Sequence, residues 1–121
     1  MEEALRERRI KTAYLQAAEQ NLRQLVSQPN YTLDSLNHTH TSFISRLHEW
    51  EQAQHLYERL ISDDALENEC LAAFNIRAKY TNFNMDIENY VLNNMFFLFS
   101  QHLRWILNKI YFYFPTIYVG Y

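Results

Sequence analysis

The sequence predicts an all-α protein, in which an antiparallel helical hairpin is completed by a third helix into a coiled-coil-like bundle. The chain of 121 residues has one glycine and two prolines, so it lacks the residues that tight turns between strands require. Apolar residues recur at steps of three and four over most of the chain, which is the spacing of one helix face. The length suits a single domain, which we expect over residues 1–91, with a tail of different character over residues 92–121.

The first helix is expected over residues 3–27. Glu2 and Glu3 favour a helix start, because acidic side chains stabilise the positive end of the helix dipole. Pro29 favours an end, since a proline disfavours helical geometry in the residue before it and cannot donate a backbone hydrogen bond. The buried face is expected to contain the apolar residues Ile10, Ala13, Tyr14, Ala17, Leu22, Leu25 and Val26.

The second helix carries the most regular pattern of the chain, a heptad seam of about four heptads. Thr32 is the expected N-cap, and the polar seam residues His40 and Gln54 are expected to specify register or partner. The seam consists of Leu33, Leu36, His40, Phe43, Leu47, Trp50, Gln54, Tyr57 and Ile61. Six apolar members are the candidate functional residues, either as core or as an association surface: Leu36, Phe43, Leu47, Trp50, Tyr57 and Ile61.

A third helix is expected to begin near the polar run Ser62-Asp63-Asp64, because short polar side chains favour helix starts. Its apolar residues again follow steps of mostly three and four: Leu66, Cys70, Ala73, Ile76, Tyr80, Phe83, Ile87 and Tyr90. The short connection favours a hairpin between the second and third helices, with the first helix covering part of the seam. A continuous rod through residue 90 is the alternative that the pattern leaves open.

The tail over residues 92–121 is aromatic and is expected to be irregular or helical, with Arg104 and Lys109 as its only charged residues. Its uncharged stretches are shorter than the roughly 20 residues that cross a bilayer, so a transmembrane helix is not expected. One interpretation is a segment that binds a membrane surface or a protein partner, for which Trp105 and the tyrosines are suitable interfacial groups. We favour the other interpretation, that the tail is translated noncoding sequence, since exposed aromatic tails promote aggregation.

Composition argues against several classes of activity. Loops that bind phosphates or dinucleotides need glycines where the backbone approaches the ligand, and Gly120 is the only glycine. The net charge of −3 provides no basic field for nucleic acid. One cysteine, Cys70, excludes an internal disulfide and a multi-cysteine zinc site. Because the N-terminus is charged, unlike a secretion signal, we expect an intracellular, cytoplasmic location.

No catalytic or metal-binding residue is assigned. His48 and His55 share a helix face, but the order of residues in a helical HExxH zinc site is absent. Cys70 lies at a seam position, where packing is expected rather than a nucleophilic role. The acidic residues that follow Ser62 lack the alternating ligands and central glycine of a calcium loop, so a solvated helix start is expected. The sequence therefore predicts a protein without enzymatic activity and without a cofactor.

The three expected helices carry a set of residues that points to a family. They are Arg8-Arg9-Ile10-Lys11, Leu22 to Val26, Leu33 to Leu36, Phe43, Arg46-Leu47, Trp50, Leu56 to Leu60, Glu69, Phe74, Arg77, Tyr80 and Ile87-Glu88. This layout, over residues 5–91, resembles the N-terminal Gag-like region of BEL/Pao retrotransposon polyproteins. The resemblance implies a truncated piece of a larger polyprotein that self-associates and has no enzymatic activity. The tail departs from the polar continuation that is usual in that family.

Two functions fit these expectations. The first is an assembly module that associates with itself or with another helical protein through exposed seam residues such as Phe43, Leu47, Trp50 and Tyr57. The alternative is a helical adaptor whose aromatic tail binds a membrane surface or a protein partner. Heptad patterns serve packing within and between chains equally well, so the sequence leaves the oligomeric state open.

Overall fold

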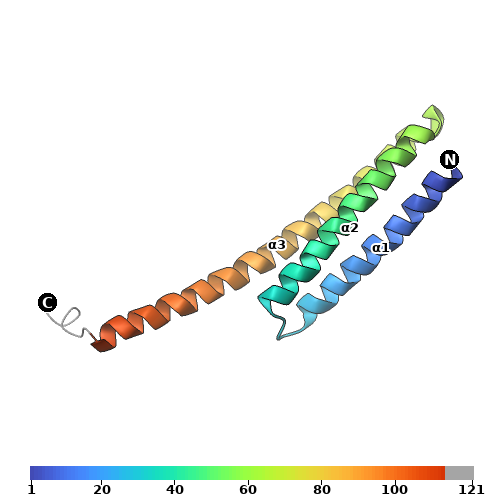
Figure 1. Ribbon diagram of the computed structural model, residues 1–121. Helices are drawn as coiled ribbons and strands as arrows, with labels where there is room; N and C mark the ends of the chain where they lie inside the picture. The colour runs from blue at the N-terminus through green and yellow to red at the C-terminus, as the bar shows by residue number, and fades with distance from the viewer. Residues whose placement is uncertain (114–121) are drawn as a thin grey trace. The chain divides into compact units, whose positions relative to one another are not determined.

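The computed structural model describes residues 1–113 and confirms the predicted all-α fold (Figure 1). It contains α1 (Glu2–Ser27), α2 (Leu33–Leu60) and α3 (Asp63–Tyr113), and the described residues include no strand. The chain divides into two compact units, unit 1 over Met1–Ile87 and unit 2 from Glu88 onward, so α3 contributes to both. Residues 114–121, the last part of the predicted tail, lie outside the described residues.

Helix α2 begins and α1 ends where the sequence predicts. Thr32 Oγ1 accepts a hydrogen bond of 3.0 Å from the backbone N–H of Ser35, which confirms Thr32 as an N-cap. Helix α1 ends at Ser27, and the next residue, Gln28, is extended and donates its backbone N–H to the carbonyl of Leu25 before Pro29 follows. A proline at this place stops further helical hydrogen bonding, so the chain turns before α2.

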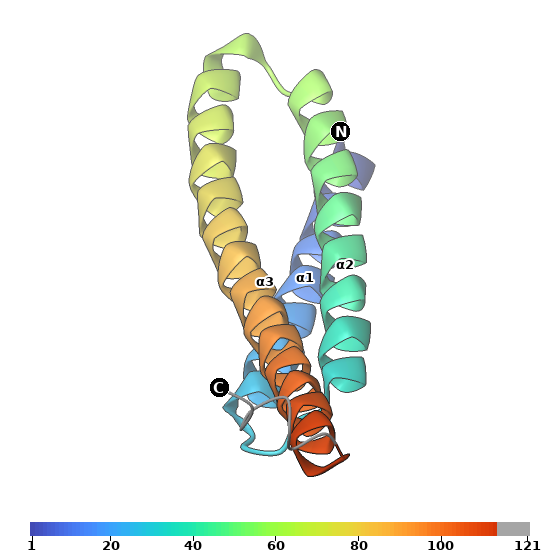
Figure 2. The same cartoon turned by 90° about the vertical axis from the view of Figure 1, so that its left-hand side faces the viewer.

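Within unit 1 the chain reverses between α2 and α3, which decides for the hairpin and against the rod. Ile61 is extended, and the carbonyl of Ser62 accepts the backbone N–H groups of Ala65 and Leu66 at the start of α3. Figure 2 shows the two helices joined at one end of the unit. Along the hairpin, Arg77 Nε donates to Glu51 Oε1 at 2.7 Å. The backbones of α1 and α2, however, lie close together over more of their length than those of any other pair of helices in unit 1.

The core of unit 1 lies where the three helices face one another. The ring of Phe43 meets Phe83 edge-on, with centroids 5.2 Å apart, and is tilted against Tyr80 at 5.9 Å. Such aromatic pairs contribute about 0.5–1.5 kcal/mol beyond the burial of their area. The large buried side chains come from all three helices: Leu15, Leu22, Leu36, Phe43, Trp50, Tyr80, Phe83 and Ile87. The third helix therefore reaches the other two mainly through large side chains.

The predicted buried face of the first helix is wrong in part. Leu15 and Ala18 are buried together with Leu22, whereas Tyr14 is exposed, and Ala13 and Ala17 are exposed as well. The inward positions follow steps of four and three in one unbroken line: Ala4, Arg8, Lys11, Leu15, Ala18 and Leu22. Arg8 and Lys11 occupy two of these positions. A prediction that chooses the buried residues by apolar character therefore shifts the buried face by about one residue.

The predicted packing role of Cys70 is also wrong, because its side chain is exposed. The inward positions of α3 in unit 1 include Ala73, Tyr80 and Ile87, which recur every seven residues. Continuing the three-four pattern back from Ala73 reaches Glu69, and this half-buried glutamate faces the other helices through an ion pair with Arg8. Glu69 therefore occupies the inward position that the sequence prediction gave to Cys70.

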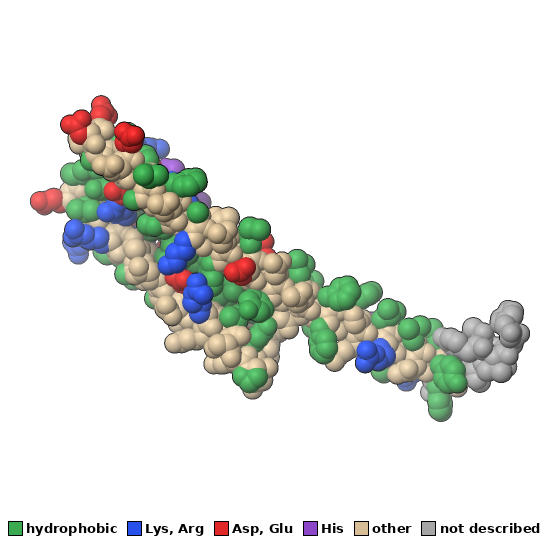
Figure 3. Space-filling model, turned by 180° about the vertical axis from the view of Figure 1, so that it is seen from behind, with side chains coloured by type: hydrophobic (Ala, Val, Ile, Leu, Met, Phe, Trp, Pro, Cys, Tyr) green, Lys and Arg blue, Asp and Glu red, His purple; other side chains and the backbone are tan. Residues whose placement is uncertain are grey.

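Unit 2 is helical as far as it is described, from Glu88 to Tyr113. Its large apolar side chains are mostly exposed, as the green surface of this part of α3 in Figure 3 shows. Among the described residues, no helix combines the length and the apolar character needed to cross a bilayer.

Candidate functional site: an interhelical pocket and an exposed apolar stripe

Five of the six candidate seam residues lie on the inward side of α2, and Ile61 follows the last residue of the helix. Leu36 and Phe43 are 0% exposed and Trp50 is 1% exposed, while Leu47, Tyr57 and Ile61 are half-buried. Of the two roles that the sequence left open for Phe43 and Trp50, their burial agrees with the core role and not with the association role. These two side chains are not available for association.

Each of the two polar residues of the seam has a contact to α3, and Gln54 has a further contact within α2. His40 Nε2 lies 2.6 Å from Asn84 Oδ1. Gln54 is buried, and its amide donates to Glu58 at 3.1 Å and to Glu69 at 3.3 Å. A buried polar group without partners would cost about 1–3 kcal/mol, so these contacts favour the observed register of α2 against α3.

Glu19 is a buried carboxylate that the sequence reading missed. It accepts Arg23 Nε at 2.9 Å within α1, and Lys79 Nζ lies 3.7 Å from its other oxygen. The hydroxyl of Tyr80 donates to the same carboxylate at 3.3 Å. The signal that could have found Glu19 is its spacing, since it lies four residues after Leu15 and three before Leu22 and so shares their face of α1. The cluster ties α1 to α3 in the middle of unit 1.

The pKa of Tyr80 is raised to about 12, first by burial and then by the charge and hydrogen bond of Glu19. Since an unfolded tyrosine titrates near pH 10, Tyr80 contributes stability that is complete below pH 10 and is lost as the pH rises through about 12. Between about pH 9.5 and 11.5 we expect the free energy of unfolding to fall by roughly 1–2 kcal/mol more in the wild type than in Tyr80→Phe, as measured by urea denaturation. Equal losses in both proteins would contradict the assignment.

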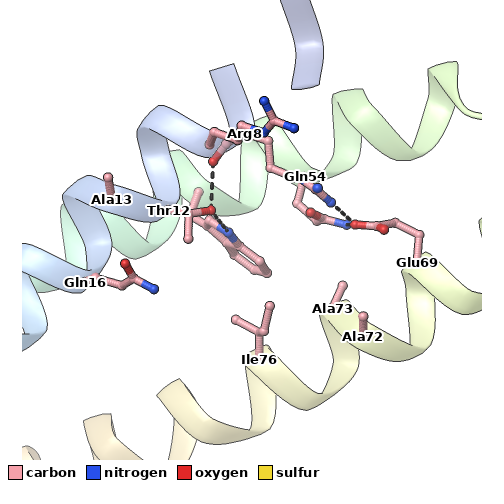
Figure 4. Close-up of a pocket in the computed structure, with 11 residues that line it drawn as sticks. Arg8, Thr12, Ala13, Gln16, Gln54, Glu69, Ala72, Ala73 and Ile76 are labelled. Atoms are coloured by element: carbon pink, nitrogen blue, oxygen red, sulfur yellow. Dashed lines mark hydrogen bonds and ion pairs between the residues drawn. The ribbon is translucent and has the colours of Figure 1, made fainter. Parts of the chain in front are cut away.

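A pocket of about 410 Å³ opens between the three helices of unit 1 (Figure 4). Helix α1 contributes Thr12, Ala13 and Gln16 to its wall, and α3 contributes Ala73 and Ile76 from the facing side. Four of the lining side chains are small, Thr12 and Ala13 on α1 and Ala72 and Ala73 on α3, and this leaves space between the helices unfilled.

The flat indole of Trp50 forms part of the same wall. Its N–H donates to Thr12 Oγ1 at 3.1 Å, and that hydroxyl in turn donates to the carbonyl of Arg8 at 2.8 Å. At one end of the pocket Arg8 pairs with Glu69, which also accepts the amide of Gln54 (Figure 4). These polar groups thus satisfy one another. The rest of the lining consists of the polar Arg9 and Gln16 and four apolar residues, Ala13, Ala72, Ala73 and Ile76.

The residues considered for chemistry are not brought together. His48 and His55 are both exposed; His55 lies 3.4 Å from Glu51, and the nearest partner of His48 is Gln52 at 3.2 Å. Cys70 is exposed at the start of α3. No group of three or more histidine, cysteine or acidic side chains that could hold a metal ion occurs between residues 1 and 113.

Unit 2 carries a regular line of apolar residues that the sequence reading did not single out. We name it the apolar stripe: Leu92, Phe96, Phe99, Leu103, Ile106 and Ile110. Its steps alternate four and three, as the core positions of a coiled coil do. The first four members are exposed and the last two are half-buried.

Comparison with known proteins adds no relative to this description. No family model matches the chain, nor does any curated protein or solved structure.

Proposed function

We propose that the chain is a non-enzymatic assembly module that self-associates through the apolar stripe of unit 2. The observation that supports this proposal is the difference in exposure between the seam of α2 and the apolar stripe. The seam of α2 is covered by the chain's own helices, whereas Leu92, Phe96, Phe99 and Leu103 are exposed at coiled-coil spacing. A helix that exposes so much apolar area in water is stabilised when another apolar surface covers it.

The residues beside the stripe suit pairing with a second copy. In the heptad that the stripe defines, the flanking positions hold Asn93, Met95, Ser100, His102, Leu107 and Lys109. Lys109 is the only one of these that is permanently charged, so two copies can approach without strong repulsion between like charges. The stripe covers about three heptads, near the lower limit at which a heptad pattern indicates a coiled coil. We therefore expect association to be reversible and dependent on concentration.

The resemblance to the Gag-like region of BEL/Pao polyproteins stays part of this proposal. The residues that carry it belong mostly to unit 1, which has its own buried core. Gag-like regions act by assembly, so the resemblance agrees with the proposed self-association, although the apolar stripe lies in the tail that departs from that family's usual polar continuation. The proposal also takes residues 92–113 as functional sequence, because a stripe of six apolar residues at regular spacing is typical of a selected helix face.

Sedimentation-velocity centrifugation of the full chain over a hundredfold range of concentration tests the proposal. We expect a dimer or larger species that grows with concentration and dissociates on dilution. A monomer at every concentration would overturn the assembly function.

A second candidate is an adaptor that binds an anionic membrane surface. It is favoured by the charge of the described part of α3 after Glu88, which holds Arg104 and Lys109 and no acidic residue. Basic and aromatic side chains next to an apolar face suit such a surface. Cosedimentation with vesicles that contain phosphatidylserine, but not with vesicles of phosphatidylcholine alone, would support this adaptor function.

A further inference from the structure

We propose that the apolar stripe of one copy docks antiparallel on the outward side of α3 in unit 1 of another copy. This inference rests on the proposed self-association and names the surface that the stripe contacts. We call that surface the outer face and define it by five residues of α3 that follow steps of three and four: Leu71, Phe74, Ala78, Thr81 and Met85.

The outer face carries the most exposed large apolar side chains of unit 1. Leu71, Phe74 and Met85 are 62%, 65% and 57% exposed, and Ala78 and Thr81 between them are exposed as well. All five positions point away from α1 and α2, because the buried residues of α3 occupy the opposite side of the helix. An apolar row of this length on a folded unit indicates a surface that binds another apolar surface.

The side chains of the two surfaces fit by size when the two helices run in opposite directions. In that arrangement each step forward along the outer face is matched by an equal step back along the stripe. Both phenylalanines of the stripe then face a small residue, so the side chains interdigitate. The parallel register that covers the same five positions would instead set Phe99 against Phe74. The antiparallel pairs, with the outer-face residue first, are Met85 and Leu92, Thr81 and Phe96, Ala78 and Phe99, Phe74 and Leu103, and Leu71 and Ile106.

The charges of the two surfaces are complementary in this arrangement. The stripe segment, residues 92–110, contains Arg104 and Lys109 and no acidic residue. Antiparallel docking brings this basic segment to the acidic start of α3 in the other copy, with Lys109 nearest to Glu67. A second stripe offers no such acidic group. The exposed acidic residues at the start of α3, visible at one end of unit 1 in Figure 3, are Asp63, Asp64 and Glu67.

Cysteine cross-linking of the full chain tests the docking. In the proposed register Asn82, beside the outer face, meets Asn93, beside the stripe, and both residues are exposed. Cys70 is the only cysteine of the chain and is replaced by serine in every variant. A chain with Asn82→Cys is mixed with a tagged chain that has Asn93→Cys, and a short bis-maleimide is added. We expect cross-linked dimers of one tagged and one untagged chain, and no cross-linked dimer from either chain alone.

Asn21→Cys is the matched control for Asn82→Cys. Asn21 is also an exposed asparagine of unit 1, but it lies on α1, away from the outer face. A chain with Asn21→Cys is expected to give no mixed dimer with the Asn93→Cys chain beyond the yield from random collisions. Equal yields from Asn21→Cys and Asn82→Cys would overturn the proposal.

Ser100→Cys separates this docking from the pairing of two stripes. Ser100 flanks the middle of the stripe, so its two copies would face each other in an antiparallel pair of stripes. Docking on the outer face places it near Asn75 of the other copy instead, so we expect a Ser100→Cys chain not to cross-link to itself. Self-linking of this chain, with no mixed Asn82–Asn93 product, would overturn the docking and leave the assembly function intact. A monomer at every concentration would overturn both.

Phe74→Glu tests the contribution of the outer face to the strength of association. We expect the dissociation constant of the full chain, measured by sedimentation equilibrium, to rise at least about tenfold, because docking would bury the new carboxylate. Leu56→Glu is the control, since Leu56 is an exposed apolar residue of unit 1, 46% exposed, that lies on α2. It is expected to leave the constant unchanged. Circular dichroism checks that both variants are folded, and equal dissociation constants for the two would overturn the outer face as the contact.

Discussion

Phe43→Ala is expected to lower the free energy of unfolding of unit 1 by about 3–5 kcal/mol, as measured by urea denaturation followed by circular dichroism. The side chain is 0% exposed, and its ring contacts Tyr80 and Phe83 of α3. Truncation would remove buried apolar area, break both ring contacts and leave a cavity between α2 and α3. Since domains of this size are stable by roughly 5–15 kcal/mol, a large fraction of the stability would be lost.

The neighbouring residue provides the control for Phe43→Ala. Ile44 is 38% exposed on the same helix, and Ile44→Ala is expected to cost less than about 1 kcal/mol. The comparison depends on burial and not on helix propensity, because alanine favours a helix at both positions. Similar losses in the two variants would mean that α3 does not cover this part of α2 in solution.

Leu103→Glu is expected to weaken self-association by at least about 100-fold. A glutamate in the stripe would place a carboxylate in the interface of each copy, and each unsatisfied buried polar group costs about 1–3 kcal/mol or more when charged. Two such groups in a dimer correspond to about 100-fold or more in the dissociation constant. The constant is measured by sedimentation equilibrium of the full chain.

Leu98→Glu is the matched control for Leu103→Glu. Leu98 and Leu103 have similar exposure, 51% and 45%, on the same helix, and the substitutions change the net charge equally. Only Leu103 belongs to the apolar stripe. We expect Leu98→Glu to associate nearly as the wild type does. If both variants lose association equally, the cause would be general apolar attraction and not a coiled-coil seam.

The sequence predicts those parts of the fold in which apolar character and helical spacing coincide. In α2 the apolar residues and the inward positions are nearly the same set, so Leu36, Phe43 and Trp50 are predicted as seam residues and are found buried. In α1 the inward line passes through cations, so apolar character alone gives a face that is wrong in part. In α3 it predicts Ala73, Tyr80 and Ile87 correctly but selects Cys70 in place of Glu69. The prediction fails where a charged side chain at an inward position contributes an apolar stem and a half-buried ion pair.

The candidate sites depend on information that no local pattern contains. The pairing of Arg8 with Glu69 and that of Glu19 with Tyr80 each join residues 61 positions apart in the sequence. The pocket results from the distance between α1 and α3. The size of the core side chains determines that distance. The apolar stripe, by contrast, could be predicted from its spacing. It was missed because the prediction for the tail used its aromatic composition and not the period of its apolar residues.

Because α3 is one continuous helix, the proposed self-association depends on the folding of unit 1. One helix of 51 residues contributes first to the core of unit 1 and then to unit 2. Starting a helix is costly and extending one is not, so the folded part of α3 provides the nucleus from which residues 88–113 extend. The stripe residues are in line only while that segment is helical. Chains with a misfolded unit 1 would thus lose an ordered stripe, and the proposed assembly would select for correctly folded copies.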